Sequence, residues 1–208
     1  MEQIKKKARK GAVTVLVPPV VVHNLDPHTG IPFMPHMAAS LAGTLDQEGY
    51  KVQVIDCFGL QPHERRVMDD FMFLGVDENW VVENILPDVK VVFLYCKTVE
   101  DLVAVERLMK EIRSQLPEIK IVLFENIQSV NSFSMKHILD ELFEQGCNIA
   151  IMGEPENRAD QVIEALIRNQ SMETIPGIAF TNENGEIQQT QDSKFNRNLN
   201  DLPLPLWE

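Results

Sequence analysis

Five short apolar runs alternate with segments of helical periodicity, and this alternation constrains the fold more than any other feature of the sequence. The runs occupy residues 13–17, 51–56, 89–95, 120–124 and 148–152. Helices are expected at 34–48, 77–86, 98–116, 132–145 and 157–169, with a further helix of undefined length inside 57–75. Strands that alternate with helices require right-handed crossovers. The pattern therefore predicts an α/β fold with a doubly wound, five-stranded parallel sheet of the flavodoxin-like or Rossmann-like type.

The chain changes character after residue 170. Asn184-Gly185 is a strong turn signal between two short apolar segments and predicts a β-hairpin. The chain is then polar from Gln189 and ends in proline-spaced leucines and Trp207, which we expect to pack on another surface. We therefore divide the chain into a basic arm (1–12), an α/β domain (13–170), a hairpin appendage (171–190) and an extended linker and tail (191–208).

Composition and charge exclude several classes of function. The formal net charge of −12 argues against a nucleic-acid partner, which needs a basic surface to neutralise phosphates. No apolar run reaches the roughly 18 residues of a membrane span, and the N-terminal segment lacks the apolar core of a signal peptide. The three cysteines have no metal-finger spacing and imply no disulfide framework. We expect a cytoplasmic protein that binds neither nucleic acid nor membrane.

The long loop after the first strand is the first candidate for a site. Residues 18–33 exceed the usual 2–6 residues of such a connection, and ligands of parallel sheets lie at this edge. The stretch from the first strand to the first helix also holds His23, His28 and His36, three of the five histidines. Asp26, His28 and Gly30 place an acid, an imidazole and a glycine close together, as in a transition-metal site. An exposed loop histidine beside an Asp-Pro turn is the equally plain alternative.

Other small-molecule sites of this fold are not supported. Neither G-x-G-x-x-G nor G-x-x-x-x-G-K-[ST] follows any expected strand, which argues against dinucleotide and P-loop chemistry. Pro18 and Pro19 open the first loop and remove two backbone donors that a flavin phosphate would need. No complete active site can be assembled on this chain from residue spacing.

Three segments of the C-terminal half carry a family resemblance. They are Gly153-Glu154-Pro155-Glu156 after the fifth strand, Ile175-Pro176-Gly177-Ile178-Ala179-Phe180 at the hairpin, and Asn198-Leu199-Asn200-Asp201-Leu202-Pro203-Leu204-Pro205-Leu206-Trp207 at the end. This succession resembles the N-terminal cobalamin-binding domain of cobalamin-dependent radical SAM enzymes. In that family the same tail leads directly into the radical SAM barrel. Residues 32–56 also resemble the family's first helix and second strand.

The resemblance implies a site at the strand ends. In the wider cobalamin-binding fold, Asp-x-His-x-x-Gly supplies the lower ligand to cobalt, which points to Asp26, His28 and Gly30 with one residue fewer before the glycine. The family usually has Gly-Gly after the fourth strand, where this chain has Glu125-Asn126, so two side chains are expected in the cleft. Thr98, Ser129, Gly153 and Glu154 lie in the loops that would contact the nucleotide tail of the cofactor. Thr98 is also a candidate helix cap, because Asp101 follows it three residues later as in a capping box.

The resemblance also implies a partner. The chain contains no C-x-x-x-C-x-x-C, so the iron–sulfur cluster and S-adenosylmethionine would belong to a missing domain or partner, in cis or in trans. The leading hypothesis is a cobalamin-binding accessory domain that presents the corrinoid to a methyltransferase-like radical SAM barrel. One alternative is a domain that kept the fold without the cofactor and mediates protein contact. Another is an unrelated metal enzyme that uses Asp26 and His28.

Overall fold

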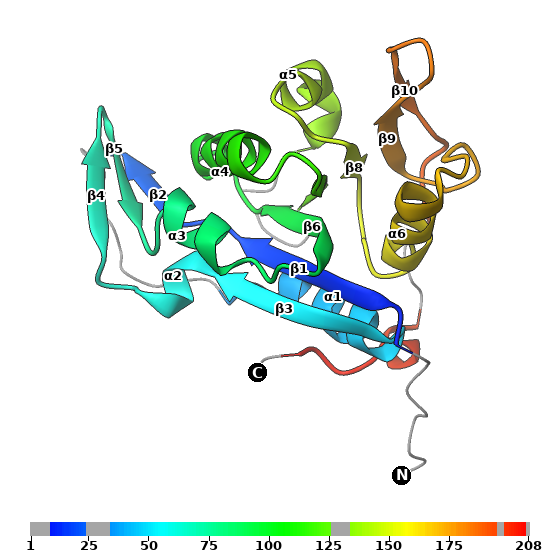
Figure 1. The fold of residues 1–208 in the computed structure, drawn as a ribbon, viewed down its shortest axis with the longest axis horizontal. Helices are drawn as coiled ribbons and strands as arrows, with labels where there is room; N and C mark the ends of the chain where they lie inside the picture. Colours follow the sequence, from blue (N-terminus) through cyan, green and yellow to red (C-terminus); the bar gives the residue numbers. More distant parts are fainter. Residues whose placement is uncertain (1–8, 24–33, 126–133, 195–197, 207–208) are drawn as a thin grey trace.

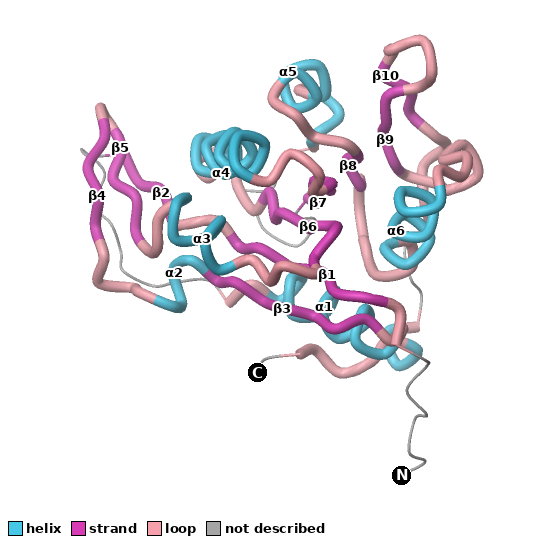
Figure 2. The backbone as a smooth tube through the Cα atoms, in the orientation of Figure 1, coloured by secondary structure: helices cyan, strands magenta, loops and turns pink. Residues whose placement is uncertain are grey.

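A seven-stranded sheet forms the centre of the computed structural model, which describes residues 9–23, 34–125, 134–194 and 198–206. The strand order is β10-β9-β8-β7-β6-β1-β3 (Figure 1; β7 is labelled in Figure 2). Their bounds are β1 Gly11–Val17, β3 Tyr50–Asp56, β6 Val89–Cys96, β7 Lys120–Glu125, β8 Ile149–Ile151, β9 Ile178–Thr181 and β10 Ile187–Gln189. The pairs from β3 to β8 are parallel, whereas β9 and β10 pair antiparallel. The sheet thus has seven strands where five were expected, because β9 and β10 extend the five parallel strands at the β8 edge.

Helices cover both faces of this sheet (Figure 2). Helices α1 (His36–Gln47) and α6 (Ala159–Arg168) pack on one face. The opposite face carries α3 (Glu78–Asn84), α4 (Leu102–Gln115) and α5 (Leu139–Glu144). Side chains of β1 alternate between the two faces of the sheet. Val13 and Val15 pack in the cluster with α1, and Leu16 packs in the cluster on the opposite face. Burial on both faces explains why the central strands are continuously apolar.

A second, antiparallel sheet lies beyond the carboxyl ends of the main strands (Figure 1). It has the order β2-β5-β4, formed by β2 (Val20–His23), β5 (Phe71–Leu74) and β4 (Arg65–Met68). Of the helix of undefined length expected inside 57–75, only the short α2 (Cys57–Leu60) forms, and β4 and β5 take up the later part of that segment. β5 pairs with β2, which is far away in sequence, and this pairing overrides the local helical pattern.

The segment before α5 also differs from the expected long helix. Its described part begins with a 3₁₀ turn, η1 (Met135–His137), and α5 starts only at Leu139. Ser134 accepts a hydrogen bond from the Lys136 amide and so begins this turn.

The C-terminal tail packs along α1 (Figure 1). It contains the 3₁₀ turn η2 (Leu199–Asp201), and the Leu206 amide donates to the Ala39 carbonyl at 2.9 Å. Gly43 permits this approach, because a Cβ atom there would lie 2.3 Å from the Leu204 carbonyl oxygen. Among the described helices, none has the length and apolar character needed to cross a membrane.

Candidate functional site

The carboxyl ends of β1 and β3 border an apolar pocket of about 450 Å³. The start of α1 forms a second wall, where the small side chains of Ala38 and Ala39 leave the space open. The tail closes one side through Leu206. The remaining lining comes from Val17, Pro18, Val20, Met34, Pro35, Val54, Asp56, Phe58, Gly59, Pro62 and Lys97. The pocket lies beside the boundary between β1 and β6, where the strand order reverses and doubly wound folds bind their ligands.

Two charged side chains contribute to this otherwise apolar lining. Asp56 ends β3, and its carboxylate accepts a hydrogen bond from the Gly59 amide at 3.1 Å, which caps α2. Lys97 follows β6, and its ammonium group lies 3.3 Å from Asp101 Oδ2. The pocket therefore combines an apolar wall with one acid and one base.

Asp101 fastens the second sheet to the loop after β6. Its carboxylate accepts hydrogen bonds from the Thr98 hydroxyl at 2.9 Å and from the Val21 amide of β2 at 3.3 Å. Burial raises the pKa of Asp101, although Lys97 and Thr98 act in the opposite direction. Thr98, expected either as a helix cap or a cofactor contact, lies before α4 and also accepts the Asp101 amide at 3.3 Å.

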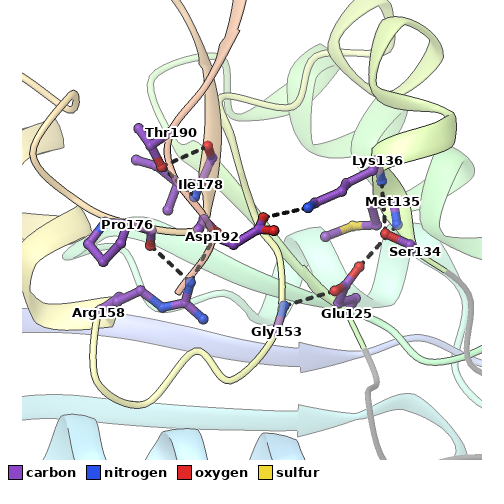
Figure 3. Close-up of polar contacts among 11 residues, drawn as sticks. Glu125, Ser134, Met135, Lys136, Gly153, Arg158, Pro176, Ile178, Thr190 and Asp192 are labelled. Atoms are coloured by element: carbon purple, nitrogen blue, oxygen red, sulfur yellow. Dashed lines mark hydrogen bonds and ion pairs between the residues drawn. The ribbon is translucent and has the colours of Figure 1, made fainter. Parts of the chain in front are cut away.

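Glu125 connects the loops after β7 and β8 (Figure 3). Its carboxylate accepts a hydrogen bond from the Gly153 amide at 2.8 Å and from the Met135 amide at 3.0 Å. The residue is only 7% exposed. The Glu125 side chain, expected in the cleft, therefore accepts hydrogen bonds from backbone amides of the neighbouring loops. Buried amides of this kind need an acceptor.

An aromatic pair packs on the face of the sheet that α1 and α6 cover, at the ends of β6 and β7. The rings of Tyr95 and Phe124 stack with centroids 4.8 Å apart and an interplanar angle of 10°. Both side chains are buried against the α1 and α6 layer. Burial raises the pKa of Tyr95, as expected for a phenol away from water. This part of the strand edge is closed by the chain's own side chains.

Arg158 holds the turn after β8 against the start of β9 (Figure 3). Its guanidinium donates to the carbonyls of Pro176 at 2.9 Å and Gly177 at 3.0 Å, and its Nε donates to the Glu154 carbonyl at 3.1 Å. Gly177 has φ +68°, and a Cβ atom there would lie 2.1 Å from Arg158 Nη1. Burial lowers the pKa of Arg158, while Glu154 and Glu156 act to raise it.

The structure brings some of the predicted site residues together and leaves others undescribed. Glu125 contacts Gly153, while Thr98 and Glu154 take part in separate networks. The predicted residues Asp26, His28, Gly30, Asn126 and Ser129 lie outside the described residues. Within the described ranges, no three His, Cys, Asp or Glu side chains are grouped to hold a metal ion.

Sequence reasoning missed the roles of Lys97, Asp101 and Arg158. The spacing of Thr98 and Asp101 in the sequence indicates only a capping box, which is a local signal. The contacts of Asp101 with β2 and of Arg158 with the start of β9 join segments that are distant in sequence. No local pattern predicts such contacts.

The fold is an α/β domain of the Rossmann-like class, with an apolar pocket at the carboxyl edge of the sheet, where folds of this class bind ligands. No family model matches the sequence, and no curated protein matches it significantly.

Solved structures identify where this fold occurs. The cobalamin-dependent S-adenosylmethionine radical enzyme OxsB, with aqua-cobalamin and S-adenosylmethionine bound, matches 93% of this chain with a TM-score of 0.68 and 18% identity. The radical S-adenosylmethionine methyltransferase TsrM from Kitasatospora setae, with cobalamin and a [4Fe-4S] cluster bound, matches 95% with a TM-score of 0.59 and 16% identity. The chain spans 24% of OxsB and 31% of TsrM. The resemblance to cobalamin-dependent radical SAM enzymes is thus confirmed at the level of the fold.

Proposed function

We propose that this chain is a cobalamin-binding domain that presents a corrinoid to a radical SAM catalytic domain. The observation that carries the proposal is the apolar pocket at the ends of β1 and β3, in a fold shared with two cobalamin-dependent enzymes. Ligands of doubly wound sheets bind at this edge. The catalytic domain would act in cis or in trans and would supply the iron–sulfur cluster and S-adenosylmethionine.

The described residues fit a corrinoid along one side of the sheet edge. The pocket volume of about 450 Å³ is in the usual range for ligand pockets, and a corrinoid would enter it in part. Val17, Ala39 and Val54 would contact the apolar faces of the macrocycle. Lys97 and Asp56 would orient its amide side chains by hydrogen bonding.

The chemistry of the reaction would come from the cofactor. A bound corrinoid supplies group transfer through its cobalt, whereas the protein supplies binding, orientation and exclusion of water. The three cysteines of the chain, Cys57, Cys96 and Cys147, are buried and belong to the core, so they would not ligate a cluster. We retain the prediction that Asp26, His28 and Gly30 form the lower side of the site, with His28 as the cobalt ligand.

Retention of hydroxocobalamin tests the proposal. The full chain is incubated with hydroxocobalamin and desalted, and its visible spectrum is recorded. We expect a corrinoid spectrum for the wild type and a loss of about tenfold or more in affinity for Val54→Glu, which places a charge in the apolar pocket. The matched control is Val67→Glu, because Val67 is an exposed valine on β4 that does not line this pocket (66% exposed, against 39% for Val54). Wild-type protein that retains no corrinoid would contradict the proposal.

A domain that has lost the cofactor and mediates protein contact is the second candidate. The specific observation in its favour is the hydrogen bond from the Gly153 amide to Glu125, together with the buried stack of Tyr95 and Phe124. These groups close the part of the strand edge where the related family usually has glycines. If this candidate is correct, wild-type protein retains no corrinoid and Glu125→Gly acquires retention. Equal retention by both proteins would exclude it.

A further inference from the structure

A second groove, of about 430 Å³, lies between α1, the start of α6 and the tail. Its lining is polar and acidic, in contrast to the apolar pocket. Four carboxylates line it, from Glu48, Glu156, Asp160 and Asp201. No lysine or arginine is among the described lining residues, so hydrogen-bond acceptors and negative charge dominate the groove.

Glu156 distinguishes this groove from an ordinary acidic surface. The residue is only 8% exposed, and its Oε2 atom has no hydrogen-bond partner among the described residues. Burial raises the pKa of Glu156, the hydrogen bond from Ser40 and the charge of Arg158 act to lower it, and Glu154 adds to the rise. A buried carboxylate oxygen without a donor is unfavourable, so a ligand that brings a donor into the groove would relieve this cost.

Asp160 of the groove already forms an ion pair with an ammonium group of the chain itself. Lys10 Nζ lies 2.5 Å from Asp160 Oδ1, and 5.3 Å from the centre of the Tyr50 ring. The Tyr50 hydroxyl also donates to Asp160, at 2.9 Å. Carboxylates beside an aromatic ring form a favourable environment for a cation. The contacts of Lys10 therefore indicate the ligand chemistry that suits the rest of the groove.

We propose that the groove binds an organic cation, an alkylammonium or guanidinium group, which enters between α1 and α6 and donates a hydrogen bond to Glu156. A bare metal ion fits less well, because the described carboxylates include no group of three arranged around one point. Two sources share the proposed chemistry: a free linear polyamine, and a lysine or arginine side chain of a protein partner. The site is separate from the apolar pocket and does not depend on corrinoid binding.

Calorimetric titration of the full chain with two probes tests this site. The probes are spermidine and a short arginine-containing peptide of matched charge, both at physiological salt so that unspecific attraction is screened. We expect at least one probe to bind the wild type, and Glu156→Gln to weaken its binding by about tenfold. Glu118→Gln removes the same charge at an exposed position outside the groove and is expected to change the affinity less than about twofold.

The outcomes separate the sources and can overturn the site. Binding of spermidine alone assigns a polyamine, and binding of the peptide alone assigns a protein side chain. Absence of binding by both probes overturns the proposal, as does equal affinity of the wild type and Glu156→Gln. If circular dichroism shows that Glu156→Gln is unfolded, Asp201→Asn on the exposed part of the tail replaces it, with an expected weakening of about threefold. An unchanged affinity of that variant also overturns the proposal.

Discussion

Glu78 is a buried acidic residue whose carboxylate is held by two arginine donors. Its carboxylate lies 2.9 Å from Arg66 Nη1 and 2.5 Å from Arg107 Nε. Both guanidinium groups also lie over the ring of Phe73, at 5.7 Å and 5.6 Å. The cluster connects β4 of the second sheet with α3 and α4, and so it joins three segments through one carboxylate.

This cluster predicts a pH-dependent stability. Burial acts to raise the pKa of Glu78, but the hydrogen bond from Arg107 and the charge of Arg66 outweigh it, so its pKa lies below the ordinary 4.5. A lowered acid pKa contributes stability that is present above about pH 4.5 and is lost as the pH falls through the native value. Glu78→Gln should therefore lower the free energy of unfolding by about 2 kcal/mol at pH 7, because two guanidinium groups lose their counter-ion. The loss should shrink as the pH falls below 4.5.

Urea unfolding at pH 7 and at a pH below 4.5 measures this difference. Glu83→Gln is the matched control, because Glu83 is an exposed glutamate on the same helix. A loss for Glu78→Gln that is the same at both pH values would contradict the assignment of the lowered pKa.

At the scale of elements, the contact between α1 and the tail is unusual because backbone meets backbone. A glycine in a helix interior normally destabilises it by about 0.5–1 kcal/mol relative to alanine. Gly43 is in the middle of α1 and faces the Leu204 carbonyl. Glycine at this position therefore lowers the stability of the helix but lets the tail pack against it.

Gly43→Ala should reverse the usual effect of such a substitution. The added Cβ atom would lie 2.3 Å from the Leu204 carbonyl oxygen, so the tail must move and the Leu206 amide should lose its bond to Ala39. We expect faster proteolysis of the tail and a lower melting temperature, by a few degrees for about 1 kcal/mol. Leu204→Ala is the control, because that side chain is 89% exposed and should change neither measurement. A more stable variant with an unchanged tail would disprove the contact.

At the scale of the whole molecule, the two sheets differ in how much core supports them. Both faces of the main sheet are packed against large apolar clusters. The smaller sheet rests on a cluster of Val21, Phe73 and Ala104, with Asp101 as its polar anchor. Fewer buried apolar contacts imply a lower free energy of local opening.

Hydrogen exchange should resolve this difference. Amides of β4 and β5 should open at a free energy at least about 2 kcal/mol below that of β6 and β7. Asp101→Ala should accelerate exchange further at β2, because the Val21 amide loses its acceptor, and should leave β7 unchanged. Equal protection of the two sheets in the wild type would show that they open as one unit.

Much of the fold and part of the site were predictable from local patterns. The parallel strands and most helices follow from hydrophobic periodicity, and the carboxyl edge of the sheet follows from the crossover rule. The β2-β5-β4 sheet was missed because its strands pair across a distance that no local pattern records. The sequence predicted that Glu125 lies beside the cleft. It could not predict the hydrogen-bond partners of Glu125, because Gly153 and Met135 come from other segments of the chain.

The sequence by itself determined the class of fold, since the period of the apolar residues distinguishes strands from helices and their alternation selects a parallel sheet. Only the tertiary structure decided which parts of the ligand edge stay open. Tyr95, Phe124 and Glu125 close one part, while the small residues of α1 leave a pocket at β1 and β3. The physical reason is that periodicity is a property of neighbouring residues. The volume and charge of a cleft, in contrast, depend on side chains from segments that meet only after folding.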